Sequence, residues 1–357
     1  MEKDRNATLD VVKGLIVLTL PVIHTVLFYC NTNVQESAYG HVLAFIAEQA
    51  APAFMLVMGI VVTIGKPRNS KQIIKRAGRL LLLGYLLNLF KFIIPELWSG
   101  LPANLFLENG IQHNSGGLFR LFVIEDILQL AAIGYLVCAF LYRLNRYGLI
   151  AGLFSISVVL FSPVAWKLNL PGSVFKIPLA LVDGLPPDAF FPIFPWITYP
   201  LTGLVVGYML RNYSDEKSYL FLSISGIVLI LLGIVGVSYE PLEWHSNFYR
   251  LGPSGTCFHI GSAFLMLCLC HFAFKFFISG TLLSFLTTFS RQITFVYMIQ
   301  WIIVGWGLSI FGYHKLEISE ALLPIIVVLF ATVSLTYLFS FGKEAFSKWG
   351  APNVDKC

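Results

Sequence analysis

The sequence contains few charged residues for its length. Of its 357 residues, 12% are Asp, Glu, Lys or Arg, and 57% are hydrophobic. A soluble domain carries charge on about one residue in four, so a soluble fold is excluded because its surface would lack charge. The mean hydropathy is +0.77, and apolar runs of about 20 residues, which cross roughly 30 Å of hydrocarbon, recur. We therefore predict an all-α, polytopic integral bundle in a cell (plasma or inner) membrane, formed as one domain over residues 1–357.

The sequence also lacks the signatures of most soluble enzymes. It has no Walker loop, no HExxH, no GxSxG and no zinc-binding spacing. Its six cysteines form no CxxC pair and most lie in apolar runs, so they are interpreted as packing residues, with no metal site or disulfide expected. The net charge is +5, but no basic stripe lies on a soluble face, which argues against a nucleic-acid partner.

Ten apolar segments are long enough to span a membrane. They are residues 9–29, 42–65, 73–95, 118–142, 147–166, 189–211, 218–238, 255–278, 288–311 and 320–341. The Pro-rich segment 171–188 is too short to cross, and we expect it at the membrane interface or packed back into the bundle. A cleaved signal peptide would need a cleavage site and no acid at Asp10, so the first segment is predicted to be retained.

Basic and neutral connecting segments alternate along the chain. The basic set carries Lys3, Arg5, Lys66, Arg68, Lys71, Lys75, Arg76, Arg143, Arg146, Arg211, Lys217, Lys343, Lys348 and Lys356. Cationic loops stay in the cytoplasm, so an even number of spans with both termini cytoplasmic is predicted. The long segments 96–117, 166–188 and 239–254 then lie outside, where they either cap an external cavity or form ordinary polar loops.

The first span carries the sharpest functional signal. Lys13 and His24 are eleven residues apart, so they lie within about 20° of one another around a helix and roughly 16 Å apart along it. Pro21 frees a carbonyl and can kink the helix below His24. An ionisable residue at membrane depth is costly and indicates function. The alternative is that Lys13 obeys the positive-inside rule and His24 is a polar contact between helices.

Residues 5–24, RNATLDVVKGLIVLTLPVIH, resemble the first helix of membrane acyltransferases. That pattern is Arg-x-x-x-Leu-Asp-x-x-Arg-Gly, then a His eleven residues after the second Arg, in whose place Lys13 stands. A more specific similarity is to the bacterial relatives of heparan-α-glucosaminide N-acetyltransferase. Four later segments resemble that family in the same order: 51–59 (APAFMLVMG), 192–208 (PIFPWITYPLTGLVVGY), 248–254 (FYRLGPS) and 289–301 (FSRQITFVYMIQW). In the last segment Gln300 stands where His is usual.

The resemblance implies a membrane acyltransferase that uses acetyl-CoA as co-substrate, with no metal. His24 would act as general base on a hydroxyl or amine of the acceptor, or would itself be transiently acylated. Lys13 and Asp10, which can pair at i,i+3, complete the expected catalytic set. The acceptor would be a sugar or glycan that enters from outside the cell.

Basic residues on the cytoplasmic side are candidates for binding the acyl-CoA donor. The resemblance implies that Arg76, Arg79 and Arg291 hold the phosphates of coenzyme A. The positive-inside rule explains the same residues equally well. Arg291 is also expected to share one semi-polar helical face with residues of the ninth span, namely Ser290, Thr294, Tyr297 and Trp301.

Two adjacent acids, Glu125 and Asp126, are predicted to lie inside the fourth span, where burying an ionisable group costs free energy. They could orient His24, bind acceptor hydroxyls or pair with Arg250. The alternative is a structural ion pair with Arg120. The residues expected to bind the acceptor are Glu125, Asp126, Trp196, Arg250 and Gln300.

The sixth span is predicted to be broken because it carries Pro192, Pro195 and Pro200. Broken helices at membrane depth line protein or water-filled cavities, so Trp196 would be a cavity-wall aromatic or, alternatively, part of an interfacial belt. Gly203 and its GxxxG partner Gly207 indicate close helix packing.

Other functions remain open at this point. Broken helices and buried charges also mark transporters of small polar solutes, although no inverted repeat is detectable. A catalytically inactive relative is a third alternative, and a homodimer is compatible with each. His259 and His271, isolated in apolar surroundings, are interpreted as structural.

Overall fold

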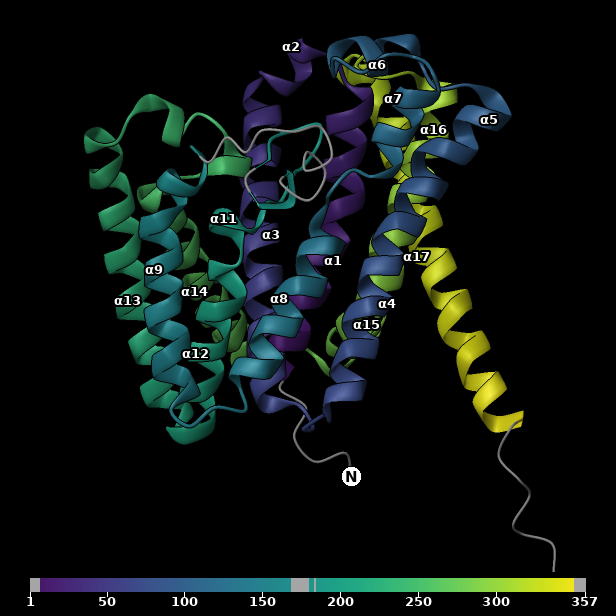
Figure 1. Cartoon of the computed structure of the whole chain (residues 1–357). Coiled ribbons are helices and arrows are strands. Elements are labelled where there is room, and N and C mark those ends of the chain that lie inside the picture. The colour runs from purple at the N-terminus through teal and green to yellow at the C-terminus, as the bar shows by residue number, and fades with distance from the viewer. Residues whose placement is uncertain (1–6, 168–179, 183, 350–357) are drawn as a thin grey trace, which may run out of the picture. The chain divides into compact units, whose positions relative to one another are not determined.

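The protein is described by a computed structural model over residues 7–167, 180–182 and 184–349, with side chains up to residue 343. Within this part of the chain every regular element is a helix, and extended pairing is limited to the isolated bridges Cys30–Leu316 and Glu125–Ala189. Figure 1 shows the helices in chain order. The predicted all-α, polytopic class is confirmed.

Nine helices or runs of consecutive helices in the described residues are long and apolar enough to cross a membrane. They are Ala7–Tyr29 (α1), Ala38–Ile64 (α3), Ser70–Ser99 (α4, Ser70–Asn88; η1, Leu89–Ile93; α5, Ile94–Ser99), Tyr147–Ala165 (α9), Ile193–Asn212 (α11, Ile193–Trp196; α12, Thr198–Asn212), Asp215–Tyr239 (α13, Asp215–Gly236; η3, Val237–Tyr239), Pro253–Phe276 (α14), Ile293–Phe311 (α16) and Ile318–Lys343 (part of α17, Ile318–Trp349). The tenth predicted span, 118–142, corresponds to the shorter apolar helix α8, Ile127–Leu141. The cytoplasmic location of both termini stays a prediction.

Short helices occupy the connecting segments. They are α2 (Thr32–Gln35), α6 (Ala103–Glu108), α7 (Ser115–Phe122), α15 (Gly280–Arg291) and the 3₁₀ turns η4 (Leu242–Trp244) and η5 (Phe248–Arg250). The prediction for segment 171–188 lies largely outside the described residues.

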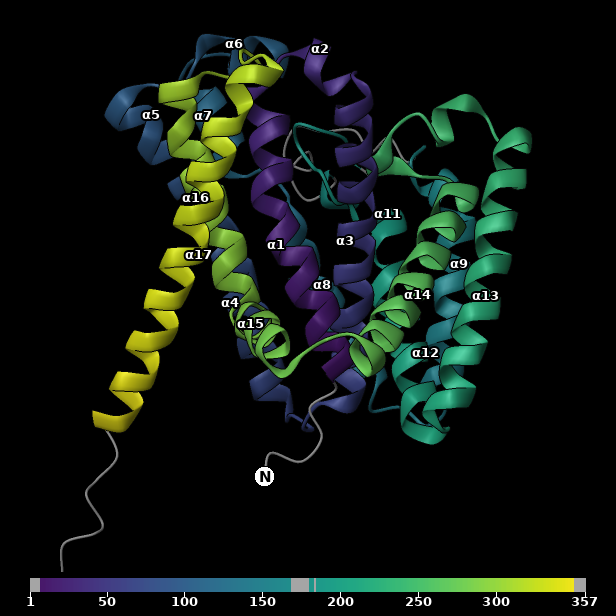
Figure 2. The ribbon, with the colours of Figure 1, turned by 180° about the vertical axis from the view of Figure 1, so that it is seen from behind.

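The chain divides into two compact units, the first of which combines residues 1–44 with residues 272–357. In this unit α1 packs against α15, α16 and α17, and Figure 2 shows these helices from behind. Val17, Phe289 and Val296 form a buried apolar cluster between them. The Tyr29 hydroxyl donates to the Val304 carbonyl at 2.7 Å, which fixes α1 against α16. That the whole chain forms one domain stays a prediction.

The predicted span 288–311 joins residues of two helices. α15 ends at Arg291 and α16 begins at Ile293, with Gln292 between them at φ −107° and ψ 19°. The Ser279 side chain accepts from the Leu282 amide and caps α15. The predicted start of the span, residue 288, therefore lies inside α15, and the spanning helix α16 begins five residues later at Ile293.

The second unit comprises residues 45–271. In it α4 packs against α8, and α12 packs against α8, α9 and α13. A Cβ atom on Gly203 would overlap the Leu56 carbonyl oxygen, and one on Gly59 would overlap the Pro200 carbonyl oxygen. α3 and α12 therefore touch through their backbones, as the GxxxG pattern predicts.

The fourth predicted span is not one helix, because the chain breaks between α7 and α8. Asp126 caps α8: it accepts from the Ile127 amide at 2.7 Å, and the Gln129 side chain accepts from the Asp126 amide at 3.2 Å. Asn88 Nδ2 donates to the carbonyls of Phe122 and Ile124. The polar side chains satisfy the backbone groups that the break releases, which is what a break at membrane depth requires.

The sixth span is broken as predicted. Phe194 lies inside α11 and has non-helical angles, φ −98° and ψ 115°, so the backbone is kinked there. The ring nitrogen of Trp166 donates to the Phe194 carbonyl at 3.2 Å. The broken backbone is therefore held by protein partners.

Candidate active site

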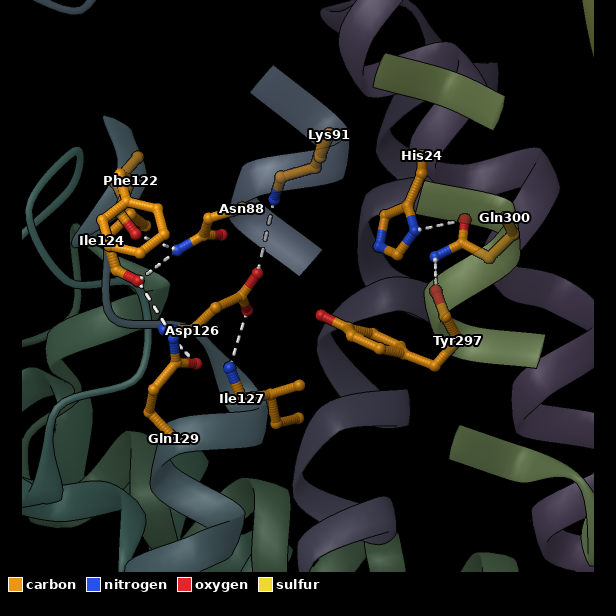
Figure 3. Close-up of polar contacts among 10 residues, drawn as sticks. All are labelled: His24, Asn88, Lys91, Phe122, Ile124, Asp126, Ile127, Gln129, Tyr297 and Gln300. Atoms are coloured by element: carbon orange, nitrogen blue, oxygen red, sulfur yellow. Dashed lines mark hydrogen bonds and ion pairs between the residues drawn. The ribbon is translucent and has the colours of Figure 1, made fainter. Parts of the chain in front are cut away.

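His24 lies on α1 in the first unit, half-buried, and is held by two residues of α16. Its Nδ1 atom is 2.9 Å from Oε1 of Gln300. Figure 3 draws this contact as a dashed line. Gln300 Nε2 in turn donates to the Tyr297 carbonyl at 3.1 Å, so the Gln300 amide presents its oxygen to the imidazole. Nδ1 must then carry the hydrogen, and Nε2 is the basic nitrogen. Gln300 thus supplies an orienting contact for which the sequence suggested an acid.

The plane of the His24 ring is fixed as well. Trp301 stacks on it with ring centroids 3.8 Å apart and an interplanar angle of 21°. Phe28 meets the Trp301 ring edge-on at 4.9 Å, and Trp301 is 7% exposed. A histidine with a fixed tautomer and a fixed ring plane is suited to general-base or nucleophilic chemistry at a defined position.

Asp10 and Lys13 form the predicted i,i+3 ion pair, with Nζ 3.2 Å from Oδ1. The Ser290 hydroxyl donates to the same Asp10 oxygen at 2.6 Å, and Asp10 is 2% exposed. The hydrogen bond from Ser290 therefore links Asp10 on α1 to α15. Along a helix Lys13 lies roughly 16 Å from His24, so the two side chains do not act on the same atom.

The predicted semi-polar face of the ninth span is divided between two helices. Ser290 and Arg291 end α15, whereas Thr294, Tyr297 and Trp301 lie on α16. Ser290 contacts Asp10, while Trp301 contacts His24. The expected single stripe is wrong because the helix restarts at Ile293.

In the second unit, the break between α7 and α8 gathers buried polar groups. Lys91 Nζ lies 3.6 Å from Asp126 Oδ2, and their side chains are 4% and 9% exposed. Lys91 lies on η1, a single π-helical turn of the kind often found at functional sites. Tyr85 donates to Glu125 Oε1 at 2.9 Å. The other carboxyl oxygen, Oε2, is buried and has no hydrogen-bond partner among the described residues.

The ion pair proposed between these acids and Arg120 is wrong. Arg120 makes two hydrogen bonds to Asp188 and one to the Gly110 carbonyl. Arg250, the other suggested partner, lies over the Trp166 ring at 5.7 Å. Lys91, which the sequence interpretation missed, pairs with Asp126. A single lysine deep in an otherwise apolar span was the signal that could have found it.

Trp196 is buried rather than placed on a cavity wall. Its exposed fraction is 1%, and its ring nitrogen donates to the Tyr249 carbonyl at 2.9 Å. Phe191 and Phe248 meet it edge-on at 4.6 and 5.2 Å. Trp196 therefore anchors the segment around η5 to α11.

A family model described as heparan-alpha-glucosaminide N-acetyltransferase, catalytic, matches residues 5–238, well over half of the chain. The chain belongs to this family. The match contains His24, the Asp10–Lys13 pair and the α7–α8 break, and it ends before α14. No curated protein matches the chain.

Membership of the heparan-alpha-glucosaminide N-acetyltransferase family identifies the chain as a multi-pass membrane protein of an acetyltransferase family. The contact partner of His24, Gln300, lies outside the matched residues. Two observations therefore point to the first span as the candidate active site. The family match contains its sequence, and the structure shows the contact of His24 with Gln300.

The arginines expected to bind the donor are accessible. Arg76 and Arg79 are exposed on the first turns of α4, and the Arg76 guanidinium lies 5.0 Å from the Tyr135 ring centroid. Arg291 is exposed at the end of α15. In the described residues no group of three His, Cys, Asp or Glu side chains is placed to hold a metal ion.

Proposed function

We propose that the protein transfers an acetyl group from cytoplasmic acetyl-CoA to a hydroxyl or amine of an extracytoplasmic sugar or glycan. The observation that carries the proposal is the contact of His24 with Gln300. His24 lies on the first helix, which is part of the match to an acetyltransferase family. A half-buried imidazole with a defined tautomer is the group that acyl transfer needs.

In the direct route, His24 Nε2 takes the proton from the acceptor as its oxygen or nitrogen attacks the thioester carbonyl carbon. The new C–O or C–N bond forms, the C–S bond breaks, and the proton passes from His24 to the departing thiolate of coenzyme A. The positive charge on the imidazole in between is stabilised by the Gln300 oxygen at Nδ1.

In the covalent route, Nε2 itself attacks the thioester carbon and the coenzyme A thiolate leaves. The acceptor then attacks the acyl-imidazolium, the acyl–nitrogen bond breaks and restores Nε2, and the proton that the acceptor loses neutralises the coenzyme A thiolate. Gln300 has the same role in both routes, because His24 Nδ1–H donates to the Gln300 oxygen throughout.

The donor-binding role of Arg76, Arg79 and Arg291 rests on charge and exposure. Guanidinium groups bind phosphate oxygens in bidentate fashion, and all three side chains are exposed. With both termini in the cytoplasm, as the loop charges predict, the first turns of α4 and the end of α15 face the compartment that contains acetyl-CoA.

The acceptor-binding role of Glu125 and Asp126 rests on the buried polar cluster at the α7–α8 break. Glu125 Oε2 has no hydrogen-bond partner among the described residues, and a buried polar atom without a partner is costly. A hydroxyl or amine of the acceptor would satisfy it. Arg250, Trp196 and Gln300 complete the proposed set, with Gln300 acting through His24 and Trp196 through packing.

The test uses purified full-length protein in nanodiscs with radiolabelled acetyl-CoA. We expect His24→Ala to lower acetyl transfer roughly 100-fold or more while the thermal shift caused by acetyl-CoA remains. Arg79→Ala should weaken that shift, and His271→Ala serves as a control that retains transfer. Absence of any acetyl-CoA shift in the wild type, or full activity in His24→Ala, would overturn the proposal. Labelled protein trapped by rapid quench without acceptor would select the covalent route.

A further inference from the structure

The second unit contains a cavity of about 300 Å³ that does not include His24. It lies between α13, α14, the segment that joins them, and Glu48 of α3. Its polar and aromatic lining residues are Glu48, His245, Ser246, His259, Phe248 and Phe258. The segment between α13 and α14 belongs to the neutral set of connecting segments and is therefore predicted to face outside.

His259 in this cavity is held in the same manner as His24. Its Nδ1 atom lies 3.2 Å from Oε1 of Gln49, and Gln49 Nε2 donates to the Phe45 carbonyl at 3.2 Å. The amide therefore presents its oxygen, Nδ1 carries the hydrogen, and Nε2 is left to accept a hydrogen bond. His259 is 5% exposed, so this acceptor is buried at the edge of an open volume.

A second buried polar atom supports a ligand. His245 Nδ1 is buried and has no hydrogen-bond partner among the described residues, and His245 lines the same cavity. Glu48, also half-buried on the lining, supplies a carboxyl group. Buried polar atoms are normally satisfied, so several polar groups on the lining of one cavity indicate a ligand with several hydroxyl or amine groups.

We infer that this cavity binds a single sugar ring, at a site separate from His24. Its volume suits a small ligand. The imidazoles, Glu48 and Ser246 offer partners for ring hydroxyls, and Phe248 and Phe258 offer apolar surface for the C–H faces of the ring. The inference rests on the proposed function only for the choice of a sugar among hydroxyl-bearing ligands.

The experiment titrates glucose, N-acetylglucosamine and glucosamine into the full-length protein in nanodiscs and follows binding by saturation-transfer NMR. We expect at least one sugar to bind saturably, and His259→Phe and Glu48→Gln each to weaken binding at least tenfold. His271→Phe is the matched control on α14, because His271 stacks on Tyr219 with ring centroids 3.8 Å apart and a phenyl ring can replace it there. Thermal unfolding of each variant shows that it is folded.

His24→Ala separates this site from the proposed active site. If the cavity binds sugar, His24→Ala retains sugar binding within twofold although it loses acetyl transfer. No saturable binding of any of the three sugars, wild-type binding in both His259→Phe and Glu48→Gln, or loss of binding in His24→Ala would overturn the inference. The acetyl-CoA shift and acetyl transfer test the proposed function by themselves, so either proposal can fail while the other stands.

Discussion

Gln300 and His24 are 276 residues apart in the sequence and share a contact of 2.9 Å between Oε1 and Nδ1. The contact has a direction, because the Tyr297 carbonyl fixes the amide nitrogen of Gln300. Gln300 is therefore a positioning residue: it sets which nitrogen of His24 is basic without itself meeting the acyl group.

Replacing Gln300 should separate catalysis from donor binding. We expect Gln300→Met, which keeps the volume and loses the hydrogen bond, to lower kcat roughly tenfold to a hundredfold. KM for acetyl-CoA should stay within about twofold, since the donor arginines are untouched. Gln300→Glu, which keeps an acceptor oxygen at Nδ1, should restore most of kcat. If Gln300 had only a structural role, its replacement would lower the melting temperature, and kcat would not differ between Gln300→Met and Gln300→Glu. Steady-state kinetics and thermal unfolding of both variants distinguish the two roles.

The Lys91–Asp126 pair makes a prediction about stability. Breaking a buried ion pair by removing one partner typically costs about 3–5 kcal/mol, so Lys91→Met should lower the free energy of unfolding by that order. Asp126→Asn combined with Lys91→Met should recover most of the loss, because Asn removes the charge and still caps α8. Lys75→Met, at an exposed position of α4, is the matched control and should change little. Additive losses in the double variant would contradict the pairing.

The close approach of α3 and α12 makes a prediction about packing. Gly203→Ala would drive a Cβ atom into the Leu56 carbonyl, and overpacking of this kind typically costs about 1–3 kcal/mol. Gly78→Ala on α4 is the matched control, since nothing lies within 4 Å of its Cβ position. It should be neutral or stabilise by up to roughly 1 kcal/mol, the ordinary helix-propensity difference. Melting temperatures in detergent measure both, and equal effects would show that the helices do not touch there.

Most of the helical bundle was predictable because a bilayer permits few kinds of spanning structure. A spanning segment must be long, apolar and internally hydrogen-bonded, so hydropathy located nine of the ten predicted spans to within a few residues at most ends. The break at Phe194 followed from three prolines. The break at Asp126 did not, although Asp-x-x-Gln before an apolar run is a helix-start pattern. Hydropathy does not reveal this break, because the apolar residues 121–124 and 130–141 on its two sides make 118–142 resemble one continuous span.

The candidate site was predictable only in part. His24 and the Asp10–Lys13 pair lie on one helix, where spacing decides which side chains meet. The partners of His24 lie on α16, and one sequence contains nothing that pairs residues 276 positions apart. Trp196 is expected on a cavity wall because a broken helix at membrane depth lines a cavity, but its burial depends on the η5 segment that it contacts. Long-range packing therefore decided each of these outcomes.

The orientation of the chain in the membrane gives the last prediction, because both proposals depend on it. Ser214, between α12 and α13, follows the basic Arg211 and is exposed, whereas Glu243, in η4, belongs to the neutral set and is also exposed. In a background with the native cysteines replaced, a membrane-impermeant maleimide applied to intact cells should label Glu243→Cys and leave Ser214→Cys unlabelled. Permeabilised cells should show labelling of both, which controls for reactivity. The reverse pattern would place the arginines of α4 outside and the α13–α14 cavity inside, which removes the route by which cytoplasmic acetyl-CoA and an external sugar reach one protein.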